Sequence, residues 1–331
     1  RKPLLQSDRK VDKEGLFTIQ GHHISTTASI GIAFSSRNSG HTVTELIKKA
    51  DSAMYISKKL GKNNYIIYTK EIEKEDKFRL MLEGGLNSAL ENHEFLLNYQ
   101  PIVDLKTGQI NAVEALIRWN HPQLGMIAPN DFISIAEESG HINSLGKWAL
   151  QTACLQNKKW QKLGAPLFKI SVNISVIQLQ HPQFVATVRQ ILESTGLEAK
   201  WLDLEITESN LMGATDSIKD TFIELKELGV SMSIDDFGTG YTSLSYLRLF
   251  AFDKVKIDRS FINEIEKDTN GKKITSSIIS LAHNLNLKVV AEGVETKDQL
   301  SYLMDEFCDE GQGFYFSYPS PAHSLPAVIN N

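Results

Sequence analysis

The sequence predicts an α/β fold: a TIM-like (β/α)8 barrel with an antiparallel first strand, preceded by a partial α+β segment. Strand-like and helix-like patterns alternate from Phe95 onward, and this alternation is typical of a parallel sheet covered by helices. The region has about 240 residues, close to the roughly 250 of a typical barrel of this class. Its eight candidate strands are 95–101, 113–117, 168–174, 202–206, 230–236, 252–258, 287–293 and 313–317.

The connections between these strands support the same fold. Apolar residues recur at helical spacing in 145–163, 182–195, 216–228, 272–285 and 297–304, as in helices that cover a barrel. The first connection, residues 104–111 around Thr107-Gly108, is too short for a helix. We therefore expect the first two strands to form an antiparallel hairpin.

The N-terminal part has a smaller pattern of its own. Two stretches with strand character, 16–19 and 24–34, precede a helix pattern that stops at Gly61. This helix starts with Thr42-Val43-Thr44-Glu45, which has the spacing of a capping box. We expect one more strand at 64–68. The pattern therefore predicts that this segment is part of an α+β domain.

The spacing of apolar residues in 70–93 predicts an amphipathic connecting helix, which the glycines Gly84-Gly85 weaken. This helix either carries a signal between domains or serves as a solvated spacer. We divide the chain into a partial N-terminal domain at 1–69, the connecting helix, and the barrel at 94–331.

Composition narrows the class of protein. The chain has 331 residues, 41% of them hydrophobic, and a net charge of −5, so neither disorder nor binding of polymeric nucleic acid or an anionic membrane is indicated. Its two cysteines, Cys154 and Cys308, lack the spacing of a zinc site and predict free thiols in a reducing compartment. We expect a cytoplasmic chain without membrane contact, and a longer membrane-anchored or sensor-linked protein stays open.

A strand that ends in two adjacent carboxylates is the central feature for function. Val230, Met232 and Ile234 alternate with polar residues, and Asp235 and Asp236 follow directly before a glycine-rich loop. Neighbouring side chains of a regular strand point to opposite faces, so both aspartates can serve one site only where the pleat breaks. A surface turn is the alternative.

Polar side chains gather at the predicted carboxyl ends of the strands, where barrel enzymes place their chemistry. They are Glu114, Arg118, Asn173, Glu205, Glu208, Asp235, Asp236, Lys256, Asp258, Glu292, Glu295 and Gln312. Each alone has an ordinary explanation, but four or more converging carboxylates would repel one another unless cations bind among them. Oxygen ligands without histidine favour Mg²⁺ or Mn²⁺ over zinc. Two such ions would suit phosphoester hydrolysis.

The motifs around these residues resemble those of the EAL domain family over about residues 75–325. They are Glu114-Ala115-Leu116-Ile117-Arg118, Val172-Asn173-Ile174-Ser175, Leu204-Glu205-Ile206-Thr207-Glu208, Asp235-Asp236-Phe237-Gly238-Thr239-Gly240, Lys256-Ile257-Asp258, Ala291-Glu292-Gly293-Val294-Glu295 and Gln312-Gly313. The resemblance implies that a water molecule activated by two metal ions hydrolyses cyclic di-GMP to linear pGpG.

The resemblance also implies roles for single residues. The metal ligands would be Glu114, Asn173, Glu205, Asp235, Asp236 and Glu292, the catalytic groups Lys256, Glu208, Glu295 and Gln312, and the substrate-binding residues Gln100, Leu116 and Arg118. Asp235 would bridge the two ions, and Lys256 would lie beside the attacking water. From its position after the strand, we expect Glu208 to accept hydrogen bonds from backbone N–H groups of the glycine-rich loop.

Near the N-terminus, Ser29-Ile30-Gly31-Ile32-Ala33 and the run from Ala50 to Tyr65 resemble the C-terminal half of a GGDEF diguanylate cyclase domain. The GGDEF signature is absent from the sequence. We expect this segment to be regulatory or structural, without cyclase activity.

Two other functions remain as alternatives. One is a cyclic di-GMP receptor with an EAL fold that binds the nucleotide without cutting it, and the other is a glycosidase that uses paired carboxylates on a barrel. The glycosidase does not explain the asparagine, the aspartate pair and the lysine together. The resemblance further suggests a homodimer.

Overall fold

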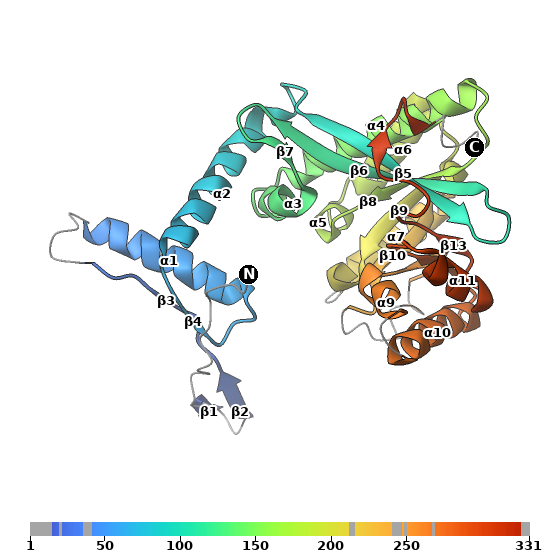
Figure 1. The fold of residues 1–331 in the computed structure, drawn as a ribbon. Helices are drawn as coiled ribbons and strands as arrows, with labels where there is room; N and C mark the ends of the chain where they lie inside the picture. The colour runs from blue at the N-terminus through green and yellow to red at the C-terminus, as the bar shows by residue number, and fades with distance from the viewer. Residues whose placement is uncertain are drawn as a thin grey trace. The chain divides into compact units, whose positions relative to one another are not determined.

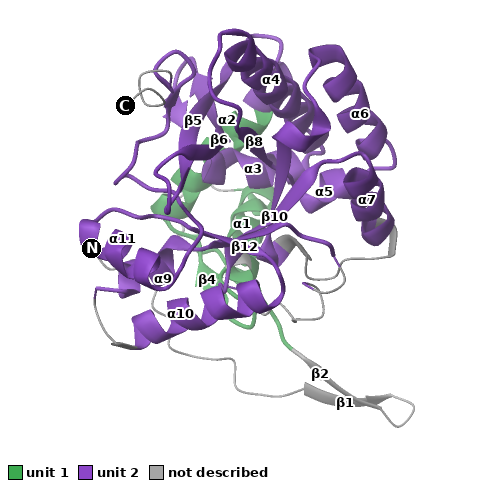
Figure 2. Cartoon of the chain, turned by 90° about the vertical axis from the view of Figure 1, so that its right-hand side faces the viewer, with its two compact units in different colours: residues 1–84 green, residues 85–331 purple. Residues whose placement is uncertain are grey.

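The computed structural model describes residues 15–19, 22–35, 42–211, 216–239, 247, 250–266 and 269–325. The chain divides into two compact units, Arg1–Gly84 and Gly85–Asn331 (Figures 1 and 2). Within the described residues, no helix is both long enough and apolar enough to span a membrane.

The described residues of the first unit form two small sheets, one complete helix and the first part of a second long helix, residues 70–84. The sheets and the complete helix are β1 (Gly15–Ile19) antiparallel to β2 (His22–Thr26), β3 (Ile30–Ile32) parallel to β4 (Tyr65–Ile67), and α1 (Val43–Lys59). The predicted capping box is confirmed, because the Glu45 N–H donates to Thr42 Oγ1 at 3.3 Å and the Thr42 N–H donates to Glu45 Oε2 at 2.7 Å. Ala53, Ile66 and Ile72 form a small core.

Helix α2 (Lys70–Ala89) continues through Gly84-Gly85 and across the boundary between the two units. A glycine inside a helix costs about 1 kcal/mol relative to alanine, and at Gly85 packing explains its presence. A Cβ at this position would lie only 3.0 Å from the Trp119 ring. Because glycine has no Cβ, the ring can pack closely against the helix backbone. The domain bounds at 69–70 and 93–94 stay predictions.

The second unit is a closed barrel, as predicted from the sequence (Figure 1). Its strands are β5 (Phe95–Asp104), β6 (Ile110–His121), β8 (Lys169–Asn173), β9 (Leu202–Thr207), β10 (Ser231–Phe237), β11 (Lys254–Ile257), β12 (Lys288–Ala291) and β13 (Glu310–Gly311). Strand β5 pairs antiparallel with both β6 and β13, which closes the barrel, and the other neighbours are parallel. The expected first hairpin is therefore confirmed.

Helices lie at all five predicted ranges. They are α4 (Ile142–Lys162), α6 (Phe184–Thr195), α7 (Asp216–Glu227), α10 (Thr269–Asn284) and α11 (Lys297–Asp305). The described residues also contain α3 (Pro129–Glu138), α5 (Val176–Leu179) and α9 (Arg259–Glu264), which were not predicted. Short 3-10 turns η1 (Ala199–Trp201) and η2 (Glu208–Leu211) flank β9, while β7 (Gly125–Ile127) and β14 (Ser320–Pro321) extend the sheet.

The predicted eighth strand at 313–317 is wrong. The strand is Glu310–Gly311, and 313–317 folds into a turn in which Phe316 and Ser317 N–H groups each donate to Gly313 O at 3.1 Å. A Cβ on Gly313 would lie 2.1 Å from Val294 O, so this glycine lets the backbone pass close to residue 294. The aromatic residues that suggested a strand belong to this turn.

Alternation along the strands separates an apolar face from a polar barrel interior. In β9, Leu202, Leu204 and Ile206 belong to the large core between sheet and helices. Asp203, between them, accepts hydrogen bonds from Ser171 and Ser233 on the two neighbouring strands. Since successive strand residues face opposite ways, Asp203 and Glu205 both point into the barrel.

Candidate active site

The aspartate pair lies at a break in strand β10. Pairing with β11 runs from Ile234 opposite Val255 to Phe237 opposite Ile257, so β10 carries one extra residue, a β-bulge. Asp236 has a φ of 54°, in the left-handed region that a non-glycine residue seldom adopts. This is the break in the pleat that a shared site required. Asp235 is only 8% exposed, so the surface-turn interpretation is wrong.

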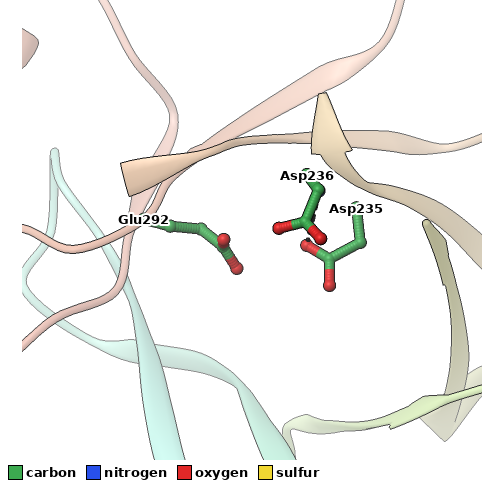
Figure 3. Close-up of side chains that lie close together, drawn as sticks. All are labelled: Asp235, Asp236 and Glu292. Carbon is green, nitrogen blue, oxygen red and sulfur yellow. Dashed lines mark hydrogen bonds between the residues drawn. The ribbon is translucent and has the colours of Figure 1, made fainter. Parts of the chain in front are cut away.

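Three carboxylates from two strands point toward one another. One oxygen each from Asp235, Asp236 and Glu292 lies within 4.8 Å of the others, and Figure 3 shows the aspartates beside the glutamate. Glu292 directly follows β12. The closed barrel therefore brings together carboxylates that are more than 50 residues apart in sequence.

Lys256 lies at the centre of the carboxylates. Its Nζ is 2.7 Å from Glu205 Oε2, 2.7 Å from Glu292 Oε1, 3.2 Å from Asp235 Oδ1 and 3.3 Å from Glu114 Oε2. The lysine is only 1% exposed. One buried ammonium thus contacts four carboxylates of the candidate metal site.

Amide side chains hold Glu114 from the other side. Asn173 Nδ2 donates to Glu114 Oε1 at 2.6 Å, and Gln312 Nε2 donates to Glu114 Oε2 at 2.7 Å. Gln312 also donates to Gln100 Oε1 at 3.0 Å, and Gln100 Nε2 donates to Ser317 O at 3.0 Å. The amides therefore fix the orientation of a carboxylate at the barrel mouth.

The crowding of charge sets the pKa values of these groups. Burial raises the pKa of Glu205 well above its usual value, and the neighbouring carboxylates add to this rise against the attraction of Lys256. The pKa of Glu292 is raised for the same reasons. Burial opposes the charge of Lys256, but the carboxylates outweigh it and raise the lysine pKa well above its usual value. In the metal-free protein Lys256 is therefore protonated.

The donor set fits hard divalent cations. Five carboxylates face one ammonium, and Glu205 Oε1 is buried without a hydrogen-bond partner among the described residues. An unpaired buried carboxylate oxygen is costly unless a cation or proton reaches it. Carboxylate and amide oxygens are the ligands that Mg²⁺ and Mn²⁺ take in proteins.

Glu208 braces the loop that follows the aspartates. Its side chain, 1% exposed, accepts a hydrogen bond from the Gly238 N–H at 2.6 Å, as expected from the sequence. Gly238 has a φ of 98° and contacts Phe261 closely, so a side chain here would be strained. Glu208 thus holds the backbone two residues after Asp236.

We expect Glu208→Ala to weaken both Mn²⁺ binding and kcat by about 10–100-fold, the usual cost of losing a group that orients a metal ligand. The protein should stay folded by circular dichroism. Glu208→Gln keeps an acceptor oxygen for Gly238 and should recover most of the loss. Unchanged turnover of Glu208→Ala at low Mg²⁺ would show that this glutamate does not position the aspartates.

Binding of Mn²⁺ should weaken as the pH falls below about 6. Burial and the charges of Asp235 and Asp258 raise the pKa of Asp236 to about 6, so below this pH a cation has to displace a proton. The apparent affinity should fall by about tenfold per pH unit for each displaced proton, measured as free Mn²⁺ by electron paramagnetic resonance. Asp236→Asn should make this dependence less steep without removing it, because the pKa values of Glu205 and Glu292 are also raised. A wild-type affinity that stays constant from pH 7 to 5 would contradict the prediction.

The carboxylates open into a cavity of about 780 Å³, within the size range of small-molecule sites. Nine of the predicted site residues line it, namely Gln100, Glu114, Leu116, Asn173, Asp235, Asp236, Glu292, Glu295 and Gln312, whereas Glu205, Glu208 and Lys256 are not among its lining residues. Arg118 is not among the lining residues, is partly buried, and donates to Ile117 O at 2.8 Å. The assigned roles of all these residues stay predictions.

An aromatic residue that lines the cavity, and a second one that stacks on it, were missed by the sequence reasoning. Phe314 lines the cavity and is 48% exposed, and Tyr318, 66% exposed, stacks on it with ring centroids 4.3 Å apart and an interplanar angle of 27°. Their aromatic-rich segment was interpreted as a strand. Four aromatic residues within five positions, directly after Gln312-Gly313, were the signal available in the sequence.

Comparison with known families matches most of the chain. Residues 84–319 match the model of the EAL domain, and residues 8–64 match that of the diguanylate cyclase GGDEF domain. A solved structure described as the PaMucR phosphodiesterase in complex with c-di-GMP is 43% identical, with a TM-score of 0.71, and the alignment covers 74% of this chain and 99% of that one.

Two relatives from Pseudomonas aeruginosa are longer than this chain. The bifunctional diguanylate cyclase/cyclic di-GMP phosphodiesterase MucR is 41% identical over 313 residues, which are 95% of this chain and 46% of MucR. The cyclic di-GMP phosphodiesterase NbdA is 40% identical over 311 residues, which are 94% of this chain and 40% of NbdA. The chain thus spans less than half of either relative.

Proposed function

The chain belongs to the EAL domain family, and we propose that it is a metal-dependent phosphodiesterase that hydrolyses cyclic di-GMP to linear pGpG. The observation that carries this proposal is the excess of buried carboxylates around Asp235, with a buried oxygen of Glu205 that has no hydrogen-bond partner among the residues that the structure describes. A nucleotide receptor without chemistry has no need for such a costly set of charges. The names of MucR and NbdA support the substrate.

Two Mg²⁺ or Mn²⁺ ions would be held by the chain's oxygen ligands. Glu114, Asn173, Glu205 and Asp235 would hold one ion, and Asp235, Asp236 and Glu292 the other, with Asp235 shared. When bound, such ions polarise a water molecule and stabilise a leaving oxygen. The oxygen of water would form a bond to phosphorus while the water loses a proton to solvent. The bond from phosphorus to the ribose 3′ oxygen would break, and the departing 3′ oxygen would take a proton from solvent.

The chain's own groups would orient the reactants. Lys256 has a protonated Nζ, so in the metal-free state it can donate a hydrogen bond to water but cannot accept a proton. Gln312 and Glu295 line the same cavity, and Gln312 fixes Glu114. Gln100, Leu116 and Arg118 would contact the nucleotide, Arg118 after leaving its present contact with Ile117 O.

The direct test is a product assay on the whole chain. Cyclic di-GMP is incubated with the protein and Mg²⁺ or Mn²⁺, and the products are separated by anion exchange. We expect linear pGpG with either ion and none in EDTA. If the protein binds cyclic di-GMP but forms no product, the receptor alternative is favoured. If both binding and turnover persist in EDTA, a metal mechanism is excluded.

Phe314 should contribute to substrate affinity more than to the chemical step. Stacking of a base on an aromatic ring is worth about 1–3 kcal/mol, so Phe314→Ala should raise KM for cyclic di-GMP by about 10-fold or more with little change in kcat. Phe314→Tyr should restore the affinity. Phe307, 81% exposed and not among the cavity-lining residues, gives a matched control, and equal KM values for Phe314→Ala and Phe307→Ala would refute the stacking role.

A further inference from the structure

The position of Lys256 has a consequence for metal binding. An ammonium has three N–H donors, and the described oxygens around Nζ belong to Glu114, Glu205, Asp235 and Glu292. These are four of the six residues assigned above to the divalent cations. Lys256 therefore contacts the same carboxylates that a metal ion would need as ligands.

Each of the four carboxylates uses one oxygen for the lysine. The contacts are to Glu114 Oε2, Glu205 Oε2, Asp235 Oδ1 and Glu292 Oε1, while Glu205 Oε1 has no hydrogen-bond partner in the described part of the chain. The ammonium thus keeps the ligand side chains converged and leaves ligand capacity open. Removing the ammonium would leave buried carboxylates without a compensating charge, which destabilises the metal-free protein.

We propose that Lys256 is an internal cation that holds the metal ligands together before metal enters and competes with it, thereby setting the divalent-cation concentration at which the site fills. This inference rests on the proposed metal site. A site assembled in this way stays preorganised without metal, which reduces the ordering that binding requires. The competition makes metal affinity lower than the carboxylates alone would give.

The test measures Mn²⁺ binding to the whole chain without nucleotide, for the wild type and for Lys256→Met, which keeps the length and removes the charge. We expect the variant to bind Mn²⁺ at least about 10-fold more tightly, because its competitor is gone. In EDTA its melting temperature should lie below that of the wild type, since the carboxylates are uncompensated, and Mn²⁺ should restore it.

Lys254, two residues earlier on β11, provides the matched control. It is 5% exposed and its Nζ is 2.5 Å from Glu310 Oε2, which is not a candidate metal ligand. Lys254→Met should also melt at a lower temperature, but Mn²⁺ should raise its melting temperature only by as much as it raises that of the wild type, because the Mn²⁺ affinity should match that of the wild type. The contrast separates loss of a buried charge from loss of a competitor.

Equal or weaker Mn²⁺ binding by Lys256→Met would overturn the inference while leaving the proposed function in place if the wild type still forms pGpG. Should Lys256→Met not fold, Lys256→Gln is measured instead, after purification in Mn²⁺. Failure of both to fold in Mn²⁺ would also overturn it, because the metal would then be unable to replace the ammonium. Absence of Mn²⁺ binding by the wild type would defeat the proposed function as well.

Discussion

Asp235→Asn is expected to abolish measurable hydrolysis of cyclic di-GMP. Asp235 contacts Lys256 at 3.2 Å and shares a site with Asp236 and Glu292, so its charge would serve both ions. A metal ion contributes several kcal/mol of charge stabilisation to such a reaction, and about 4 kcal/mol corresponds to about a thousandfold in rate. The measurement is kcat at saturating Mn²⁺, with pGpG quantified by anion exchange.

The control for this loss is Asp298→Asn, which removes a carboxylate from the exposed first turn of α11. It should leave kcat unchanged. Asp235→Asn should fold, because asparagine keeps the shape of the side chain and its amide retains an oxygen. If Asp235→Asn hydrolyses cyclic di-GMP within about 10-fold of the wild type, the bridging role is wrong.

Removal of metal should weaken binding of cyclic di-GMP by at least about 100-fold. Five carboxylates and one ammonium leave the metal-free site with excess negative charge, and the ligand brings two phosphates. At an effective dielectric constant of about 20, two like charges 4 Å apart cost about 4 kcal/mol, and each 1.4 kcal/mol is about a tenfold change in affinity. Titration calorimetry in EDTA, and again in Ca²⁺ or Mn²⁺, measures the difference.

A charge variant checks the electrostatic cause. In EDTA, Glu292→Gln removes one repelling carboxylate and should bind cyclic di-GMP more tightly than the wild type does under the same conditions. Equal affinity of the wild type with and without EDTA would instead point to a receptor that relies on Arg118 and stacking, since such a site needs no cation.

Sequence reasoning predicted the barrel because alternation of apolar patterns is a local property that the closed sheet preserves. The antiparallel hairpin followed from the short link after Asp104, and the converging aspartates from the requirement that the pleat break after Ile234. The hairpin and the break in the pleat each depend on a few neighbouring residues. The bulge at Asp236 is the break that the two aspartates require to share one site.

The eighth strand was mispredicted because a long-range contact decides it. The backbone of Gly313 passes against Val294, and Tyr315 N–H donates to Val294 O at 2.9 Å, so the aromatic stretch turns instead of extending. Nothing local in the sequence shows which residue approaches this glycine. The exposure of Phe314 at the cavity follows from the same turn.

The central place of Lys256 was also beyond sequence reasoning. The spacing of strand ends predicts which residues reach the barrel mouth, but the reach of a flexible lysine side chain depends on how the opposing charges converge in three dimensions. The sequence suggested that the converging carboxylates need cations among them, and the pKa directions of Glu205 and Glu292 agree with an excess of negative charge.

The most direct test of the account is a single-turnover experiment in ¹⁸O-labelled water. The metal-stripped chain, in excess over cyclic di-GMP at a concentration high enough for binding, is mixed with Mn²⁺, and the nucleotide is analysed by mass spectrometry. The account predicts conversion to linear pGpG that carries one ¹⁸O in its 5′ phosphate, and no conversion before Mn²⁺ is added. Intact cyclic di-GMP bound to the Mn²⁺-loaded chain would contradict it.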